Sequence, residues 1–117
     1  MTLQRKGSPP EGQFIATIEG RSMEPRVREG SLCLFGPPDP PPYRDRIFLV
    51  AHGAIEEDGL EGPFALKQIE LKKRRNGSQR ITLRSLNPDY PPVAIDGREA
   101  ELRIVAQLVD VMLAPDR

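Results

Sequence analysis

Prolines and glycines divide this sequence into short apolar segments, and that division limits the possible fold more than any other feature. The 117 residues include 13 prolines and 10 glycines, which fall mainly between apolar segments. Because both residue types interrupt helices and favour turns, the pattern predicts many short strands rather than long helices. Residues 36–44 contain five of the prolines, so they are predicted to form an exposed loop.

The apolar segments predict roughly six to eight short strands and at most one or two helical turns. Residues 47–51 form a continuous apolar run, which is typical of a strand buried on both faces. Asn76-Gly77 is a strong hairpin signal. Residues 102–113 are long enough for a helix, but their β-branched side chains favour a long strand. The other expected strands cover residues 14–18, 31–35, 64–72, 81–86 and 93–95.

The expected organisation is a flexible N-terminal lead-in over residues 1–12 and a single domain over residues 13–117. Residues 24–30 can hold one helical turn, because a proline stands near their start and a glycine ends them. The fold class is therefore mainly β, built as a folded sheet or a small barrel.

Charge and cysteine content exclude several functional classes. The 17 basic and 17 acidic residues balance, so the net charge gives no reason to expect a nucleic-acid or membrane partner. No apolar run is long enough to span a membrane, and no signal peptide opens the sequence. The single cysteine, Cys33, excludes an internal disulfide and fits a cytoplasmic location. No residue cluster has metal-binding spacing, and we expect neither a metal nor a cofactor.

Lys67 occupies a strand position where a core residue is expected. Side chains alternate along a strand, so Lys67 shares an otherwise apolar face with Ala65 and Ile69. Burial disfavours the charged ammonium group, and a neutral lysine amine can act as the general base for a serine nucleophile. In the alternative interpretation, the stem of Lys67 packs at the sheet margin while its ammonium group reaches water.

Ser22 follows the first predicted strand, within the string Gly-Arg-Ser-Met-Glu-Pro. One interpretation is an ordinary helix N-cap, in which the hydroxyl oxygen accepts a hydrogen bond from a backbone N–H. The other is a nucleophile, which needs an exposed oxygen on a rigid turn with free N–H groups beside it for an oxyanion. The N–H groups of Ser22 and Met23 are the natural donors for that role.

Five segments of this chain carry a family resemblance in the same order. They are Ser-Met-Glu-Pro with the following Glu29-Gly30, residues 46–51, residues 64–69 around Lys67, the Leu-x-Ser-x-Asn-x-x-Tyr-Pro string at residues 83–91, and residues 104–113. Together they resemble the LexA and phage-repressor family of Ser-Lys peptidases over roughly residues 14–113. Each motif is short, and their order makes the combination specific.

The resemblance implies roles for individual residues. Ser22 would be the nucleophile and Lys67 the general base, with the backbone N–H groups of Ser22 and Met23 as oxyanion donors. The implied fold is a LexA- or signal-peptidase-like sheet, and the implied function is that of a self-cleaving repressor or SOS-response peptidase. The implied partners are a second copy, bound through the C-terminal strand, and a peptide segment of the parent chain or of a partner protein. Direct nucleic-acid binding by this domain is not expected.

Two features depart from the family pattern. Family members usually cut an Ala-Gly or Cys-Gly bond well upstream of the serine, but this sequence contains neither dipeptide, and only 21 residues precede Ser22. Lys67 follows Ser22 by 45 positions, and the extra length falls in loops at residues 36–44 and 54–62, where a β scaffold tolerates insertions. The alternative function is therefore a non-catalytic dimerisation or regulatory module that retains the peptidase fold.

Other chemically interesting residues have ordinary structural interpretations. His52 at a strand end is expected to be a surface loop residue. Cys33, between two leucines, is expected to be a packed core residue rather than a reactive thiol. The basic run at residues 72–75 is expected to be solvated at a hairpin tip, since it has no aromatic partners for nucleic acid.

Overall fold

The computed structural model describes residues 2–4, 12–52, 64–96 and 102–115, and every regular element in these ranges is a strand. The eight strands pair antiparallel in one sheet, in the order β1-β2-β3-β8-β4-β5-β6-β7. They are β1 (Thr2–Gln4), β2 (Phe14–Thr17), β3 (Leu32–Gly36), β4 (Phe48–Ala51), β5 (Phe64–Lys73), β6 (Gln79–Arg84), β7 (Val93–Asp96) and β8 (Arg103–Leu113). The mainly β prediction is confirmed, in the form of an open folded sheet.

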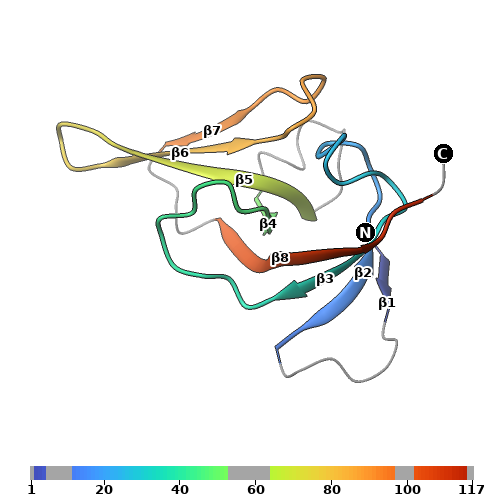
Figure 1. Ribbon diagram of the computed structural model, residues 1–117. Helices are drawn as coiled ribbons and strands as arrows, with labels where there is room; N and C mark the ends of the chain where they lie inside the picture. Colours follow the sequence, from blue (N-terminus) through green and yellow to red (C-terminus); the bar gives the residue numbers. More distant parts are fainter. Residues whose placement is uncertain (1, 5–11, 53–63, 97–101, 116–117) are drawn as a thin grey trace.

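The sheet divides into two wings because two of its strands change partners. Residues 64–67 of β5 pair with β4, whereas residues 68–73 pair with β6. In the same way, residues 103–107 of β8 pair with β4 and residues 107–113 pair with β3. Figure 1 shows the result, with β5, β6 and β7 on one side of the picture and β1, β2, β3 and β8 on the other. The short strand β4 joins the two wings.

Strand β4 is buried on both faces, as its continuous apolar sequence predicts. Ile47, just before the strand, and Leu49 belong to one apolar cluster, together with residues of β2, β3 and β8. Phe48 and Val50 belong to a second cluster, together with residues of β5, β6 and β7. Because alternate side chains of one strand enter different clusters, β4 connects the two halves of the hydrophobic core.

Most predicted elements are confirmed by the structure. The hairpin at Asn76-Gly77 closes with a 2.8 Å hydrogen bond from Arg74 N to Ser78 O. The segment 103–113 is a strand rather than a helix. Residues 37–42 are exposed, as their proline content predicts. The predicted connection at residues 53–62 lies outside the described residues.

Two short segments add local detail to the strand pattern. Residues 24–30 form turns without a helix, although one helix-like hydrogen bond joins Val27 N to Met23 O at 2.9 Å. Within the expected flexible lead-in, Thr2–Gln4 form β1 and pair with β2. Three residues with a single apolar side chain are too few to identify a strand by pattern, so only the pairing with β2 identifies β1. No helix in the described ranges is long and apolar enough to cross a membrane.

The burial of Cys33 predicts low thiol reactivity. Its side chain is fully buried in β3, and this burial, with a smaller contribution from the Asp110 carboxylate, raises the pKa of the thiol to about 11. Since the thiolate is the reactive form, alkylation by iodoacetamide at pH 8 should be slow in the native protein and fast after denaturation. Mass spectrometry measures both rates. Native alkylation as fast as that of the denatured chain would contradict the core assignment.

Candidate active site

Ser22 lies on a closed turn that connects β2 to β3. Two backbone hydrogen bonds close the base of the turn, from Ile18 N to Ser31 O at 2.9 Å and from Gly30 N to Ile18 O at 2.8 Å. Gly20 has a φ of 94°, a conformation that side-chain-bearing residues rarely adopt, so a glycine is required two residues before Ser22. The backbone therefore reverses direction between β2 and β3 at this turn.

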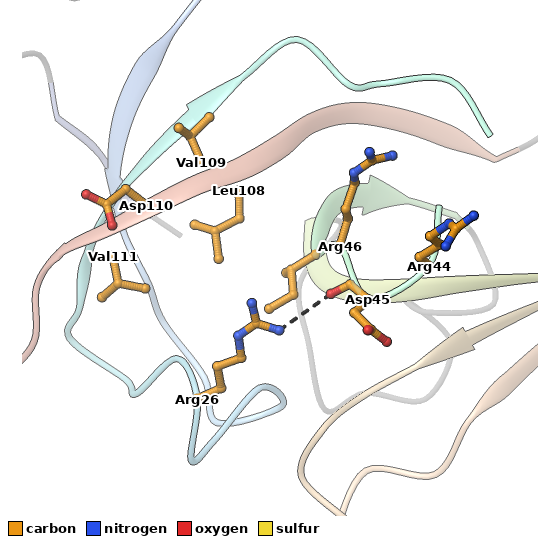
Figure 2. Close-up of a pocket in the computed structure, with 9 residues that line it drawn as sticks. Arg26, Arg44, Asp45, Arg46, Leu108, Val109, Asp110 and Val111 are labelled. Atoms are coloured by element: carbon orange, nitrogen blue, oxygen red, sulfur yellow. Dashed lines mark hydrogen bonds between the residues drawn. The ribbon is translucent and has the colours of Figure 1, made fainter. Parts of the chain in front are cut away.

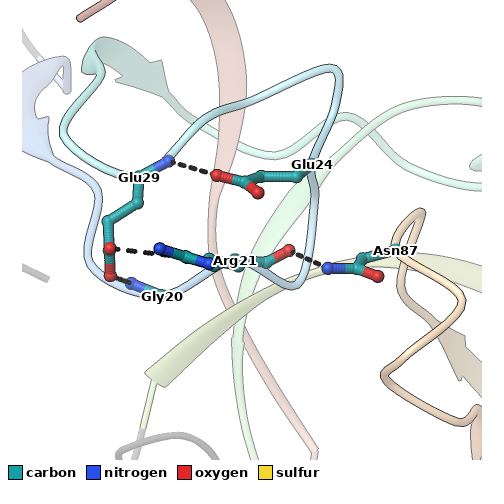
Figure 3. Close-up of polar contacts among 5 residues, drawn as sticks. All are labelled: Gly20, Arg21, Glu24, Glu29 and Asn87. Carbon is teal, nitrogen blue, oxygen red and sulfur yellow. Dashed lines mark hydrogen bonds and ion pairs between the residues drawn. The ribbon is translucent and has the colours of Figure 1, made fainter. Parts of the chain in front are cut away.

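Carboxylates hold the two arms of the turn together. Glu29 Oε2 accepts a 2.9 Å hydrogen bond from Gly20 N, and Glu29 Oε1 lies 3.8 Å from Arg21 Nε. Glu24 Oε2 in turn accepts a 3.3 Å hydrogen bond from Glu29 N. Figure 3 shows Glu29 between the two arms, with Asn87 reaching the turn from another segment. These contacts span the turn from residue 20 to residue 29 and fix the backbone around Ser22.

The residues around Ser22 are anchored in the core. Met23 is 2% exposed and Val27 is 1% exposed, both within the cluster shared by β2, β3 and β8. Ser22 itself is 7% exposed, which is less open than the sequence analysis expects of a nucleophile. In the described part of the chain no helix follows Ser22, so the serine is not a helix N-cap.

The backbone N–H groups of Ser22 and Met23 have no hydrogen-bond acceptor among the described residues. The next N–H group, that of Glu24, donates to Arg21 O at 3.1 Å. Two adjacent N–H groups without acceptors are what an oxyanion site requires.

Lys67 is buried, and the alternative in which its ammonium group reaches water is wrong. The residue is 2% exposed, and its neighbours on the same face, Ala65 and Ile69, belong to the apolar cluster of β5, β6 and β7. Lys67 Nζ donates a 2.6 Å hydrogen bond to Ser85 Oγ and lies 5.8 Å from the centre of the Tyr90 ring. A buried amine thus has a polar partner, as burial of such a group requires.

Residues 85–87, directly after β6, contact both Lys67 and the turn that carries Ser22. Ser85 binds Lys67, and Asn87 N donates to Ser22 O at 2.9 Å. The side chain of Asn87 also donates to Arg21 O at 2.9 Å. Between them, Leu86 packs against the core cluster that contains Met23. One short segment therefore brings the two predicted site residues into a single network.

The sequence pattern alone gives no separate role to Ser85 or Asn87, although both lie in the string that carries the family resemblance. Their position depends on the pairing of β5 with β6, in which Gln68 faces Arg84. A hydrogen bond between Arg84 and Glu70 strengthens this end of the hairpin and holds the pKa of the Glu70 carboxyl below its usual value. Strand register of this kind is not visible in a single sequence.

Two clefts flank the loop at residues 41–46. One has a volume of about 520 Å³ and follows residues 108–111 of β8, where Arg26 Nη1 contacts Asp45 O at 3.5 Å (Figure 2). The other, of about 620 Å³, follows residues 68–71 of β5. Neither of these clefts is lined by Ser22 or Lys67. Each cleft lies along a strand beyond the point where that strand stops pairing with β4.

The remaining candidates do not form a second site in the described part of the chain. His52 is 9% exposed rather than a surface residue, because it directly follows β4, the strand with partners on both sides. Residues 72–75 are exposed at the hairpin, as predicted. No group of three or more His, Cys, Asp or Glu residues is arranged to hold a metal within the described ranges.

The family model and the similar proteins agree on one family for this chain. The model of the Peptidase S24-like family matches residues 1–109. The LexA repressors of Citrifermentans bemidjiense and of Geobacter sp. strain M21 are each 28% identical to this chain over 101 residues. That alignment covers 86% of this chain and 43% of each repressor, so the chain spans less than half the length of these relatives.

The side chain of Asn87 should stabilise the fold more than a local turn residue does. Asn87 and Asn76 each accept a 3.0 Å hydrogen bond from the N–H two residues ahead. Asn76 also accepts from Ser78 Oγ at 2.6 Å, an exposed contact within the same turn, whereas Asn87 donates to Arg21 O in a distant segment. We expect Asn87→Ala to lower the free energy of unfolding by about 1–2 kcal/mol, and Asn76→Ala by about half as much. Urea denaturation measures both. Equal losses would show that the contact with Arg21 contributes nothing.

Proposed function

The chain belongs to the Peptidase S24-like family, and from this membership we propose that it is a LexA-like peptidase domain in which Ser22 is the nucleophile and Lys67 the general base. One observation carries the proposal. The segment of residues 85–87 hydrogen-bonds both to Lys67 Nζ and to the backbone of Ser22. A nucleophile and its base must be held in a fixed relation, and a shared segment provides one.

The proposed reaction is acyl transfer to Ser22. The neutral amine of Lys67 takes the hydroxyl proton as Ser22 Oγ attacks the scissile carbonyl carbon. The N–H groups of Ser22 and Met23, which lack acceptors in the described structure, donate to the oxyanion. The Lys67 ammonium group then protonates the leaving amine as the C–N bond breaks, and water hydrolyses the acyl-enzyme. The low exposure of both residues supports this chemistry, because electrostatic interactions strengthen where water is excluded.

The proposed substrate is an extended peptide segment, from the parent chain or from a partner protein. Residues 64–67 of β5 pair with β4 on one edge, and the pairing with β6 on the other edge begins only at Gln68. That second edge of residues 64–67 has no strand partner among the described residues. An extended peptide can add to such an edge through backbone hydrogen bonds. The exposed Phe64 at its start offers an apolar contact.

A second candidate function is a non-catalytic dimerisation module, and the surface of β8 favours it. Val109, Met112 and Leu113 are 53%, 49% and 67% exposed. Beyond Leu108, whose N–H binds Ile47 O at 2.8 Å, β8 pairs with β3 alone. Exposed apolar side chains beside a free strand edge suit pairing with a second copy. Dimerisation through β8 is also compatible with peptidase activity. We propose a cytoplasmic location for the protein with either function.

Covalent labelling tests the nucleophile and the base. A fluorophosphonate probe should react with Ser22, forming an O–P bond and releasing fluoride while Lys67 accepts the hydroxyl proton. Lys67→Met should lower this rate by about 100-fold or more, since general-base catalysis is lost. The adduct is located and timed by mass spectrometry of peptides.

Two variants serve as controls for the labelling experiment. Ser22→Ala should not be labelled, and Lys72→Met, which removes an exposed lysine of the same strand, should react as the unmodified chain does. Equal labelling of the Ser22→Ala variant would end the peptidase proposal. Absence of labelling together with a stable dimer would support the non-catalytic module.

Charged substitutions on β8 test the dimer. Val109→Glu combined with Leu113→Glu should raise the dimer dissociation constant by about tenfold or more, because an apolar interface does not accommodate unpaired carboxylates. Sedimentation velocity over a range of concentrations measures the constant. Phe64→Glu, an equivalent change on another strand, should leave it unchanged. A monomeric starting protein, or a variant that dimerises as well as the parent, would contradict this interface.

A further inference from the structure

The hydroxyl group of Ser85 is a hydrogen-bond partner of the proposed base. Ser85 Oγ accepts from Lys67 Nζ at 2.6 Å, which is short for a contact between a lysine and a hydroxyl. Lys67 is 2% exposed and Ser85 is partly buried, so the lysine end of this bond is shielded from water. Ser85 follows the last residue of β6, whose partner Gln68 directly follows Lys67 in β5. The strand register therefore determines the position of Ser85.

We propose that Ser85 is a positioning residue, which fixes the orientation of the Lys67 amine for proton transfer from Ser22. The inference rests on the proposed Ser-Lys mechanism and extends it to a third side chain. A neutral amine has one lone pair and two N–H groups, and it rotates about the Cε–Nζ bond. When one N–H group is held by Ser85 Oγ, this rotation is restricted and the lone pair keeps a defined direction.

The aromatic ring of Tyr90 also lies near the Lys67 amine. The centre of the Tyr90 ring lies 5.8 Å from Nζ, within the range of an interaction between a cation and an aromatic face. Such a contact suits the ammonium form that proton transfer produces. Ser85 and Tyr90 belong to the same stretch after β6, which turns back through a 3.0 Å hydrogen bond from Tyr90 N to Asn87 O.

The same stretch also fixes the nucleophile. Asn87, two residues after Ser85, donates its N–H to Ser22 O and its side-chain amide to Arg21 O, both at 2.9 Å. Movement of this segment would therefore displace the base and the serine turn together rather than separately. Because Ser85 lies in this segment, its hydrogen bond to Lys67 relates the direction of the amine to the position of Ser22. A partner on an unrelated loop would not do so.

A purely structural role for Ser85 is the competing explanation, because any buried amine needs a hydrogen-bond acceptor. The two roles differ in what they change. Loss of a structural partner lowers stability, whereas loss of a positioning partner lowers the rate of bond formation at Ser22 without changing probe binding. Threonine and valine have nearly the same shape and differ in the hydroxyl, so they separate the two roles at position 85.

The experiment compares Ser85→Thr, Ser85→Val and the parent chain by fluorophosphonate labelling of Ser22 over a range of probe concentrations. We expect Ser85→Val to lower the maximal labelling rate by about 10- to 100-fold, with the half-saturating probe concentration unchanged. Ser85→Thr, which retains the hydroxyl, should recover most of the rate. Thr82→Val on β6 is the matched control, because it removes a hydroxyl from the preceding strand, and it should label as the parent does. Thermal unfolding confirms that each variant is folded.

The outcomes separate this inference from the function on which it rests. If the parent labels at Ser22 and Lys67→Met abolishes labelling, equal rates for the Thr and Val variants would overturn the role of Ser85 alone. A folded Ser85→Thr variant as slow as Ser85→Val would also overturn it, because the hydroxyl would then not be the decisive group. If the parent chain does not label at Ser22, both the peptidase proposal and the role of Ser85 are overturned.

Discussion

The burial of Lys67 is the constraint on which the arrangement of the site depends. A lysine amine that is almost completely removed from water needs a hydrogen-bond partner, and Ser85 Oγ provides one at 2.6 Å. Ser85 reaches that position because β6 pairs with β5 in a register that ends beside Lys67. The chain then continues to Asn87, which binds the backbone of Ser22. The segment after β6, which supplies the partner of the buried amine, thus connects the strand of Lys67 with the turn of Ser22.

The change of partners along β5 gives Lys67 its surroundings. At Lys67 the strand still pairs with Phe48 of β4, and at the next residue it pairs with β6. A strand with one partner on each side along its whole length would have both edges paired, whereas β5 leaves one edge of residues 64–67 without a partner in the described structure. Burial of the side chain and accessibility of the adjacent backbone edge are therefore compatible. A peptidase that binds its substrate as a strand requires both.

The sequence predicts the strands and the inward direction of Lys67 because these depend on local patterns. Alternation placed Lys67 with Ala65 and Ile69, and the β-branched residues of the last segment favoured a strand over a helix. Pairings between distant residues are not encoded in such patterns. The strand β1, the burial of His52 and the contact between Lys67 and Ser85 all depend on which strands become neighbours. Even the turn after Ser22, locally compatible with a helix, is determined by its contacts with Glu29 and the core.

The long separation between Ser22 and Lys67 in sequence is not evidence against their acting together. The proline-rich loop at residues 36–44 is attached to the sheet, since Asp39 and Gln107 exchange hydrogen bonds of 2.8 and 3.2 Å. Just after it, Asp45 O accepts from Gln68 Nε2 at 3.0 Å. Strand β4 then begins at Phe48, directly opposite Lys67. The residues added in this first loop therefore end before β4 begins and do not alter its register with the lysine strand. For a β scaffold of this kind, strand register rather than the number of intervening residues decides whether two side chains share a site.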